Sequence, residues 1–414
     1  MPTTVVSFIG TGRRSNEADP RTRYSKTTYR FLLPGIGARL ESTSLFGVGL
    51  LRYLRATKVD VDRWLVMGTS ASLWSELYEL LDNPDEVLEE YCEIDELVAA
   101  KQVTTEALAK WQSVLNSRLN RVQFSLCLTG SAMELPSQHE AARAMFQHIP
   151  RGNRVVMDIT HGFRHQPVIA TAIVSLMRWT HDIQHVRYFY GAYDAREGDV
   201  APAVELPIFQ ELLEATEASA ILDTTGNYQQ TASRLGMDAE LAWFLESTNQ
   251  LGSAKNQVNR LQQVLSEPTD PIRTELHDLL ADRLEWARQD KFVSRYRQAA
   301  RNALDQNDYF RAVVLVYEGL LVLANSILRP GSDPVNYQYR EESGKEIVAK
   351  LSGEEKRLFK HLANTRNACA HGTRSDVFEV QQILATPQAF RAFMEEAFGL
   401  FDRFPKILAD EANR

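Results

Sequence analysis

Two short stretches of this sequence carry side chains whose types and spacing suit chemistry on phosphate groups. The first is Asp158-Ile159-Thr160-His161-Gly162, and Arg164 follows it closely. Hydroxyl, imidazole and guanidinium groups beside a glycine-bearing turn can hold an anion, because backbone N–H groups are also free to donate there. We therefore interpret this stretch as a binding site for an anionic ligand.

The second stretch, Arg366-Asn367-Ala368-Cys369-Ala370-His371, ends a predicted helix just before Gly372. Asn367 and His371 are four residues apart and share one helix face, with Arg366 beside them. An imidazole can remove the proton of an RNA 2′-hydroxyl, and a guanidinium can stabilise the charge that develops on the phosphate. An amide can orient either group. This grouping suits RNA cleavage without a metal ion.

An ordinary helix end is the other interpretation of the second stretch. Glycine is a common stop signal, and an arginine five residues before a histidine occurs again at Arg143 and His148, where we interpret it as structural. The copy at 366–371 differs because asparagine follows the arginine and small residues surround it. Upstream, Ser352 and Glu355 have the spacing of a capping box, which predicts that this helix begins there.

The residues around the first stretch predict half of a parallel β-α-β unit. Residues 155–157 are a short apolar run that suits a buried strand. Pro167 stands where a first helical position would tolerate it, and the dense apolar residues at 168–179 predict a helix that packs on a sheet. Such sheets bind ligands at the carboxyl ends of their strands, which is where Asp158 and the turn after it lie.

Two more predicted strands end in loops of the same kind. Gly10-Thr11-Gly12-Arg13-Arg14 follows a strand at 4–9, and Gly68-Thr69-Ser70-Ala71-Ser72 follows a strand at 64–67. Glycines let the backbone approach a ligand closely, although many Gly-x-Gly turns are only turns. The three loops form one site only if their strands are neighbours in the sheet. The candidate ligand-binding residues are Gly10, Thr11, Gly12, Thr69, Ser70, Asp158, Thr160, His161, Gly162 and Arg164.

Strands alternate with helices up to about residue 205, which predicts a doubly wound, Rossmann-like α/β domain with a mostly parallel sheet. Pro202 and Pro207 mark its end, and only helices are predicted beyond them. We expect a ligand-sensing domain at 1–205, a helical connector at 206–290 and an all-α domain at 291–414. Further expected strands lie within 21–33, 122–128 and 185–193. The expected helices are 44–54, 73–81, 137–148, 208–222, 238–265, 271–306, 308–328, 344–351, 353–371 and 387–409.

The composition is that of an ordinary globular chain, with 414 residues of which 44% are hydrophobic and 24% charged. We find no run of about 18 apolar residues and no signal segment. Cys92, Cys127 and Cys369 lack metal or redox spacing, which predicts a reducing cytoplasm. The net charge of −8 means that a nucleic acid would need a local basic patch.

The two stretches together resemble a known family. Asp158-Ile159-Thr160-His161-Gly162 resembles the DxTHG signature of CRISPR-associated proteins with an N-terminal CARF domain. The stretch 366–371 is similar to the Arg-x-x-x-x-His motif of HEPN ribonucleases. The order of an α/β sensor and a helical effector is that of the CARF–HEPN ribonucleases of type III CRISPR systems. Gly10-Thr11-Gly12, Gly68-Thr69-Ser70 and Tyr190-Gly191-Ala192 also resemble segments of such proteins.

The resemblance implies a function. The CARF domain would bind a cyclic oligoadenylate, for which we favour tetra-adenylate over hexa-adenylate, and binding would activate cleavage of single-stranded RNA without sequence preference. Both domains would pair in a homodimer, so that Arg366, Asn367 and His371 of two chains share one catalytic cleft. The products would carry 2′,3′-cyclic phosphate and 5′-hydroxyl ends. No metal or other cofactor is expected.

Several alternatives remain at this point. Asp158 can cap the helix that follows it, and Thr160 with His161 can cleave a bound ring inside the sensor domain. His161 and His165 lack a carboxylate or cysteine that would complete a metal site. A ligand-controlled regulator that binds DNA through a helix-turn-helix at 227–262 is a second function. A small-molecule α/β enzyme with a helical dimerisation module is a third.

Overall fold

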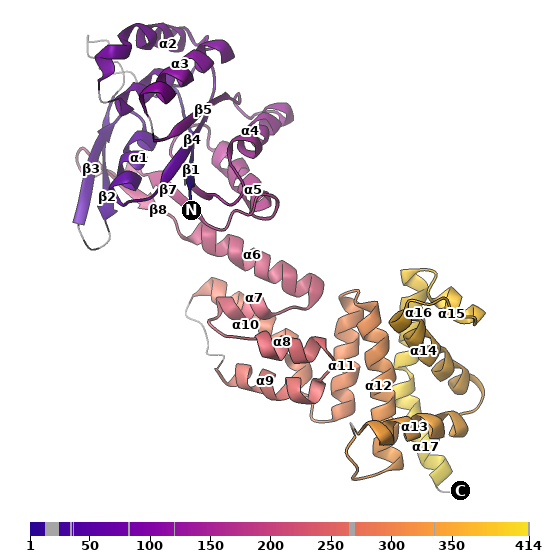
Figure 1. Ribbon diagram of the computed structural model, residues 1–414. Coiled ribbons are helices and arrows are strands. Elements are labelled where there is room, and N and C mark those ends of the chain that lie inside the picture. Colours follow the sequence, from indigo (N-terminus) through magenta and orange to yellow (C-terminus); the bar gives the residue numbers. More distant parts are fainter. Residues whose placement is uncertain are drawn as a thin grey trace. The chain divides into compact units, whose positions relative to one another are not determined.

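The computed structural model divides the chain into two compact units, Met1–Leu213 and Glu214–Arg414 (Figure 1). The first is an α/β unit and the second is helical, which confirms the predicted fold class. The predicted end of the first domain, at 205, precedes the boundary between the units. Arg13, Arg14 and the start of the strand region expected at 21–33 lie outside the described residues. The structure describes residues 1–12, 25–33, 35, 37–81, 83–119, 121–264, 270–334 and 336–412.

One eight-stranded sheet forms the centre of the first unit, in the order β3-β2-β8-β7-β6-β1-β4-β5. The strands from β7 to β5 are parallel to one another, as predicted. These parallel strands are apolar because helices cover both of their faces. The strands are β1 Thr3–Phe8, β2 Thr27–Leu33, β3 Gly37–Thr43, β4 Val61–Gly68, β5 Gln123–Leu128, β6 Arg154–Asp158, β7 Val186–Gly191 and β8 Val200–Glu205.

Two strands were missed by the sequence patterns. β3 pairs with β2 as an antiparallel hairpin, and β8 lies between β7 and β2. The expectation that strands end at Pro202 is wrong, because this proline lies within β8. A proline cannot donate to a neighbouring strand, but its carbonyl still accepts from the N–H of Ala192 at 2.9 Å. The sheet therefore continues through the position that we predicted as its end.

Helices cover the two faces of the sheet as two separate layers, each with its own hydrophobic cluster (Figure 1). One layer holds α1 Phe46–Ala56, η2 Trp74–Leu80, η3 Pro84–Val87, α2 Leu88–Ala100 and α3 Thr105–Arg118. The other layer holds α4 Leu135–His148, α5 His165–Thr180 and the first residues of α6 Ile208–Thr225. A short 3₁₀ turn, η4 Tyr193–Ala195, follows β7.

Two local predictions in this unit need correction. The helix expected at 73–81 is the 3₁₀ helix η2. Helix α5 begins at His165, so Pro167 is its third residue and not its first. The position still tolerates proline, because none of the first four N–H groups of a helix has a partner within the helix.

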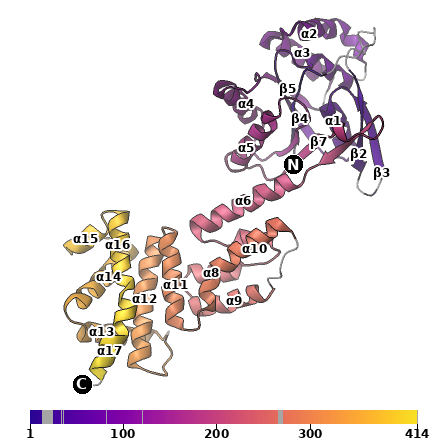
Figure 2. The same cartoon turned by 180° about the vertical axis from the view of Figure 1, so that it is seen from behind.

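The second unit is helical throughout its described residues, as predicted (Figure 2). The expected helices at 238–265, 271–306 and 387–409 are each divided into shorter helices. Residue 265 lies outside the described part of the chain. The short helices α7 and α15 were not predicted. The helices after α6 are α7 Gln229–Arg234, α8 Glu240–Ser247, α9 Leu251–Val264, α10 Pro271–Arg283, η5 Glu285–Arg288, α11 Phe292–Asp305, α12 Tyr309–Leu328, α13 Tyr337–Lys350, α14 Gly353–His371, α15 Phe378–Ile383, α16 Pro387–Phe398 and α17 Leu400–Ala412.

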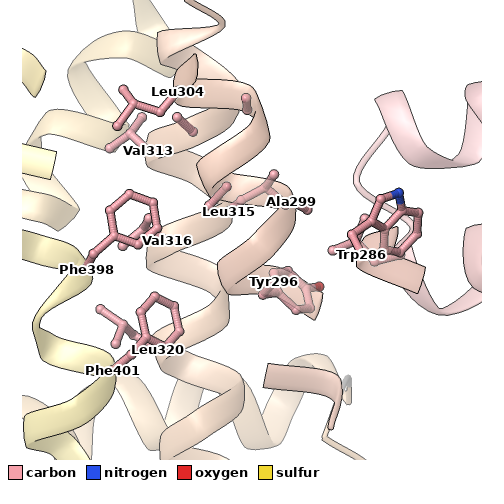
Figure 3. Packing of buried hydrophobic residues seen from close by; sticks show 14 of the residues in the cluster. Trp286, Tyr296, Ala299, Leu304, Val313, Leu315, Val316, Leu320, Phe398 and Phe401 are labelled. Carbon is pink, nitrogen blue, oxygen red and sulfur yellow. The ribbon is translucent and has the colours of Figure 1, made fainter. Parts of the chain in front are cut away.

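A single hydrophobic core runs through the second unit from Leu222 to Leu408. Trp286 and Tyr296 belong to the same cluster as Phe398, although we predicted a domain boundary at 290/291 (Figure 3). The segments expected as a connector and as an all-α domain thus share one core in the structure.

Helix α12 is the central element of this core and contacts α11, α13, α14, α16 and α17. By length and composition it is the one helix among the described residues that is apolar enough to cross a membrane. In this fold 67% of its most apolar window is buried inside the protein, which is the behaviour of a core helix. It carries Tyr317 and Glu318, which contact the end of α14.

Candidate functional site

The three predicted loops converge at one edge of the sheet. Strand β1 lies between β6 and β4, so the carboxyl ends of these strands are neighbours. A Cβ atom added to Gly10 would lie 3.4 Å from the backbone nitrogen of Gly162. The N–H of Leu73, after the β4 loop, donates to the carbonyl of Gly10 at 3.0 Å. β4 and β5 extend from one side of β1 while β6 and β7 extend from the other, so the loops meet at a topological switch point.

Asp158 and Thr160 hold the turn after β6. Asp158 is buried, and its Oδ1 accepts from the N–H of Thr160 at 3.0 Å. Thr160 Oγ1 accepts in turn from the N–H of Gly191 at the end of β7, at 2.9 Å. The interpretation of Asp158 as a helix cap is wrong, because α5 begins only at His165. Burial raises the pKa of Asp158, against the opposing effects of His161 and of hydrogen bonds from Thr160 and Ser7.

His161 joins this turn to the start of helix α1. Its Nε2 accepts from the backbone N–H of Phe46 at 3.1 Å, which assigns the ring proton to Nδ1 in a neutral imidazole. Burial lowers the pKa of His161, which favours this neutral form, although Asp158 acts in the opposite direction. The neighbouring His165 contacts the carbonyl of Ser131 at 2.9 Å through its own Nε2. The two histidines therefore have different partners.

Gly162 occupies a position that only glycine fits. Its φ of +88° lies in the left-handed region. A Cβ atom there would lie 2.5 Å from Oε1 of Gln166 and 2.9 Å from Cβ of Phe8 in strand β1. The same Gln166 oxygen accepts from the N–H of Phe163 at 2.9 Å, so it is not free to move away. The glycine allows the turns after β1 and β6 to touch.

The loop after β4 is closed by Ser72, which lies in the predicted loop but was not among the candidate ligand-binding residues. Ser72 Oγ accepts from the N–H of Thr69 at 2.9 Å and donates to the carbonyl of Ile9 at 2.8 Å. Thr69 Oγ1 accepts from the N–H of Ala71 at 3.2 Å. These bonds fix the loop against the end of β1. The candidates whose residues are exposed at this edge are Thr11, Gly12, Ser70, Gly162 and Arg164.

A fourth loop belongs to the same edge and was missed. It follows β5, and its Gly130 carbonyl accepts from Nε2 of Gln166 at 3.3 Å. The contact between His165 and Ser131 lies in the same place. A signal for it was present, because Thr129-Gly130-Ser131 repeats the pattern of a strand followed by glycine and hydroxyl groups.

A buried acidic cluster lies beside the start of α1, and it makes the stability of the protein depend on pH. Burial, together with the charges of Glu79 and Asp95, raises the pKa of Glu76 to about 7 against the opposing effects of Ser44 and Lys26. Glu79 in turn accepts from the hydroxyl of Ser44 at 3.2 Å and pairs with Lys26 at 3.0 Å. The cluster thus ties the segment before α1 to η2.

We expect the free energy of unfolding to fall as the pH rises from 4.5, the ordinary value for Glu76, to about 7. In this range the unfolded chain has released the proton that the folded chain still holds, at a cost of about 3 kcal/mol in total. The variant Glu76→Gln should lose most of this decline in urea unfolding measured at pH 4.5 and pH 8. The exposed Glu96→Gln serves as the control, and an unaltered pH dependence in Glu76→Gln would refute the assignment.

In the second unit, α14 ends as predicted at His371, and Gly372 follows with a φ of +62°. Ser352 occupies the N-cap position, but its side chain makes no capping hydrogen bond, so the predicted capping box is wrong in this detail. Asn367 and His371 are exposed on the last turns of the helix. Arg366 is half-buried, and its Nη1 donates to Oδ1 of Asn367 at 2.8 Å.

The other histidine of this helix, His361, belongs to a different surface. It lines a groove of about 360 Å³ formed by α14, α15 and α16, together with Arg357 and Glu379. His371 does not line this groove. His361 is therefore a suitable comparison for tests of His371.

The fold and the site define a class of protein: a Rossmann-like α/β unit with glycine-bearing loops at its switch point, joined to a helical unit that presents arginine, asparagine and histidine at one helix end. No family model matches the chain. A CRISPR-associated protein of Methanocaldococcus jannaschii is 26% identical over 318 residues, which cover 69% of this chain and 48% of that protein. The chain thus spans about half the length of this relative.

Among solved structures, Csm6 of Enterococcus italicus, bound to cyclic hexa-2′-fluoro-hexa-dAMP, matches over 99% of both chains with 10% identity and a TM-score of 0.32. The sequence relative is CRISPR-associated, and the order of the two units and the motifs at Asp158–Gly162 and Arg366–His371 resemble those of CARF–HEPN proteins.

Proposed function

We propose that this protein is a cytoplasmic endoribonuclease of type III CRISPR defence that a cyclic oligoadenylate activates. The observation that carries the proposal is that one chain holds both the loops that meet at the switch point of the sheet and the Arg366-Asn367-His371 grouping on α14. A protein that only sensed a ligand would have no use for the grouping on α14, and a protein that only cut RNA would have no use for the loops at the switch point.

A cyclic oligoadenylate suits the loop edge of the first unit by its chemistry. It is a polyanion, and the exposed Thr11, Ser70 and Arg164 offer hydroxyl and guanidinium donors beside the glycines. Residues such as Asp158, Thr160 and His161 form the framework that holds this edge. We propose the tetra-adenylate as the preferred ring and the hexa-adenylate as the less favoured one.

Cleavage by the second unit would need no metal ion. His371 would remove the proton of an RNA 2′-hydroxyl, which then attacks the adjacent phosphorus atom and displaces the 5′-oxygen of the next nucleotide. Arg366 would stabilise the negative charge on the phosphate during this step. The imidazolium of His371 then gives its proton to the displaced 5′-oxygen, so the products are a 2′,3′-cyclic phosphate and a 5′-hydroxyl. The exposure of His371 allows a single-stranded RNA to reach it.

A homodimer is part of the proposal. Helix α5 exposes Val168, Leu176 and Trp179 to 70%, 53% and 63%, and these apolar side chains lie on one side of the helix. A second copy of the chain would cover them. A ring with rotational symmetry suits a two-fold axis between two identical sensor units.

The test is a cleavage assay with the full chain, labelled single-stranded RNA and EDTA, with and without cyclic tetra-adenylate or cyclic hexa-adenylate. We expect cleavage only when a ring is present, and at a lower concentration of tetra-adenylate. No cleavage with either ring contradicts the proposal. A salt-dependent shift of duplex DNA under the same conditions would instead favour a DNA-binding regulator.

A further inference from the structure

The guanidinium of Arg366 is contacted by side chains of its own helix α14 and of helix α12. Its Nη2 donates to Oε1 of Glu318 at 3.3 Å, and Glu318 lies on α12. Its Nη1 donates to Asn367, and the guanidinium lies over the ring of Tyr317 with 5.1 Å to the ring centre. The arginine is thus fixed by two hydrogen bonds and one ring contact, two of them from a helix other than its own.

Glu318 is shared between two arginines. Its second oxygen pairs with Arg340 of α13, so that one carboxylate joins α12, α13 and α14. The Glu318 side chain is only 14% exposed, against 33% for Arg366 and 21% for Arg340. A carboxylate in such surroundings forms stronger hydrogen bonds than one in water.

The contacts leave Arg366 able to bind a further anion. A guanidinium has five N–H donors, and the bonds to Glu318 and Asn367 use one on each Nη atom. The remaining donors can contact a phosphate while the first two stay in place. An arginine without such support would sample several rotamers and would have to be ordered by the substrate at each turnover.

We propose that Glu318 is the positioning residue for Arg366, which it holds in the orientation that stabilises the phosphate during RNA cleavage. The inference rests on the proposed ribonuclease function and adds to it a residue 48 positions upstream, on another helix. No feature of the sequence around Glu318 indicates this role, because the contact depends on the packing of α12 against α14.

The test measures kcat and KM of RNA cleavage for Glu318→Gln in the full chain with a saturating ring. Glutamine keeps the size of the side chain but removes the charge that orients the guanidinium. We expect kcat to fall about 10- to 100-fold, with KM changed by less than about threefold, because the lost orientation matters most in the transition state. The melting temperature and the ring-binding stoichiometry report the folded fraction.

Arg340→Gln is the matched control. It breaks the ion pair between α12 and α13 but leaves Glu318 in contact with Arg366, and its kcat should stay within about threefold of the unchanged chain. Equal losses in the two variants, an unchanged kcat in Glu318→Gln, or a loss explained by the folded fraction would overturn the inference while the proposed function stands. If the unchanged chain cuts no RNA with either ring, the proposed function fails and this inference fails with it.

Discussion

The variant His371→Ala is expected to lose RNA cleavage by a factor of about 10² to 10⁴, which is the usual contribution of a general acid–base group. The side chain lies exposed at the last residue of α14, so its removal should leave the fold unchanged. The measurement is the initial rate of cleavage of labelled RNA in EDTA with a saturating cyclic oligoadenylate. Ring affinity, measured separately by calorimetry, should remain as in the unchanged chain.

His361→Ala provides the control for this prediction. It removes an imidazole from the same helix ten residues earlier, where the side chain lines the groove with α15 and α16. Its rate should equal that of the unchanged chain. Equal rates for His371→Ala and the unchanged chain would show that the histidine is only a helix end, which is the alternative interpretation of the motif.

Gly162→Ala should weaken ring binding by about 100-fold. The left-handed φ of +88° costs an L-residue about 1–2 kcal/mol, and the added Cβ would also collide with Gln166 and Phe8. Relief of that collision must separate the turn after β6 from the end of β1, where the candidate ligand loops meet. A loss of about 3 kcal/mol corresponds to the 100-fold change. Titration calorimetry with cyclic tetra-adenylate measures it.

Gly152→Ala is the control that separates the cost of the left-handed backbone from the effect of the collision at Gly162. Gly152 also has a positive φ, of +74°, but a Cβ atom there meets nothing within 4 Å, and the residue precedes β6 at the opposite edge of the sheet. This variant should lose stability in a thermal melt and keep its ring affinity. If both variants bind the ring alike, the turn at Gly162 does not belong to the binding site.

Much of the fold follows from patterns that local chemistry sets. Buried parallel strands need continuous apolar runs such as residues 155–157, and the helices between them need one apolar face. The alternation of strands and helices in the first unit could therefore be predicted from the sequence. The sequence patterns failed to predict a strand where the neighbouring strands, and not the segment's own residues, stabilise it. β8 contains a proline, and it forms because β2 and β7 lie on both sides of it. The segments on the two sides of the boundary expected at 290/291 share one core, because residues far apart in sequence pack together there.

In the candidate sites too, the sequence predicted the residues of local motifs but not the contacts between distant segments. The sequence indicated Asp158 and His371 because each lies in a recognisable local motif. It did not indicate that Ser72 closes the β4 loop onto β1, or that Glu318 contacts Arg366. Their roles come from partners 63 and 48 residues away, and a single sequence contains no pattern for such separations.

By itself, the sequence determined the two kinds of unit, their order and the side chains that carry the proposed chemistry, because strand and helix periods and turn residues act over a few neighbouring positions. Only the tertiary structure decided that the loops after β1, β4 and β6 form one edge, since strand order depends on which apolar faces pack together. It also decided which side chains support the others. His161 is bonded to α1 and Arg366 to α12, contacts that form only when helices distant in the chain come together.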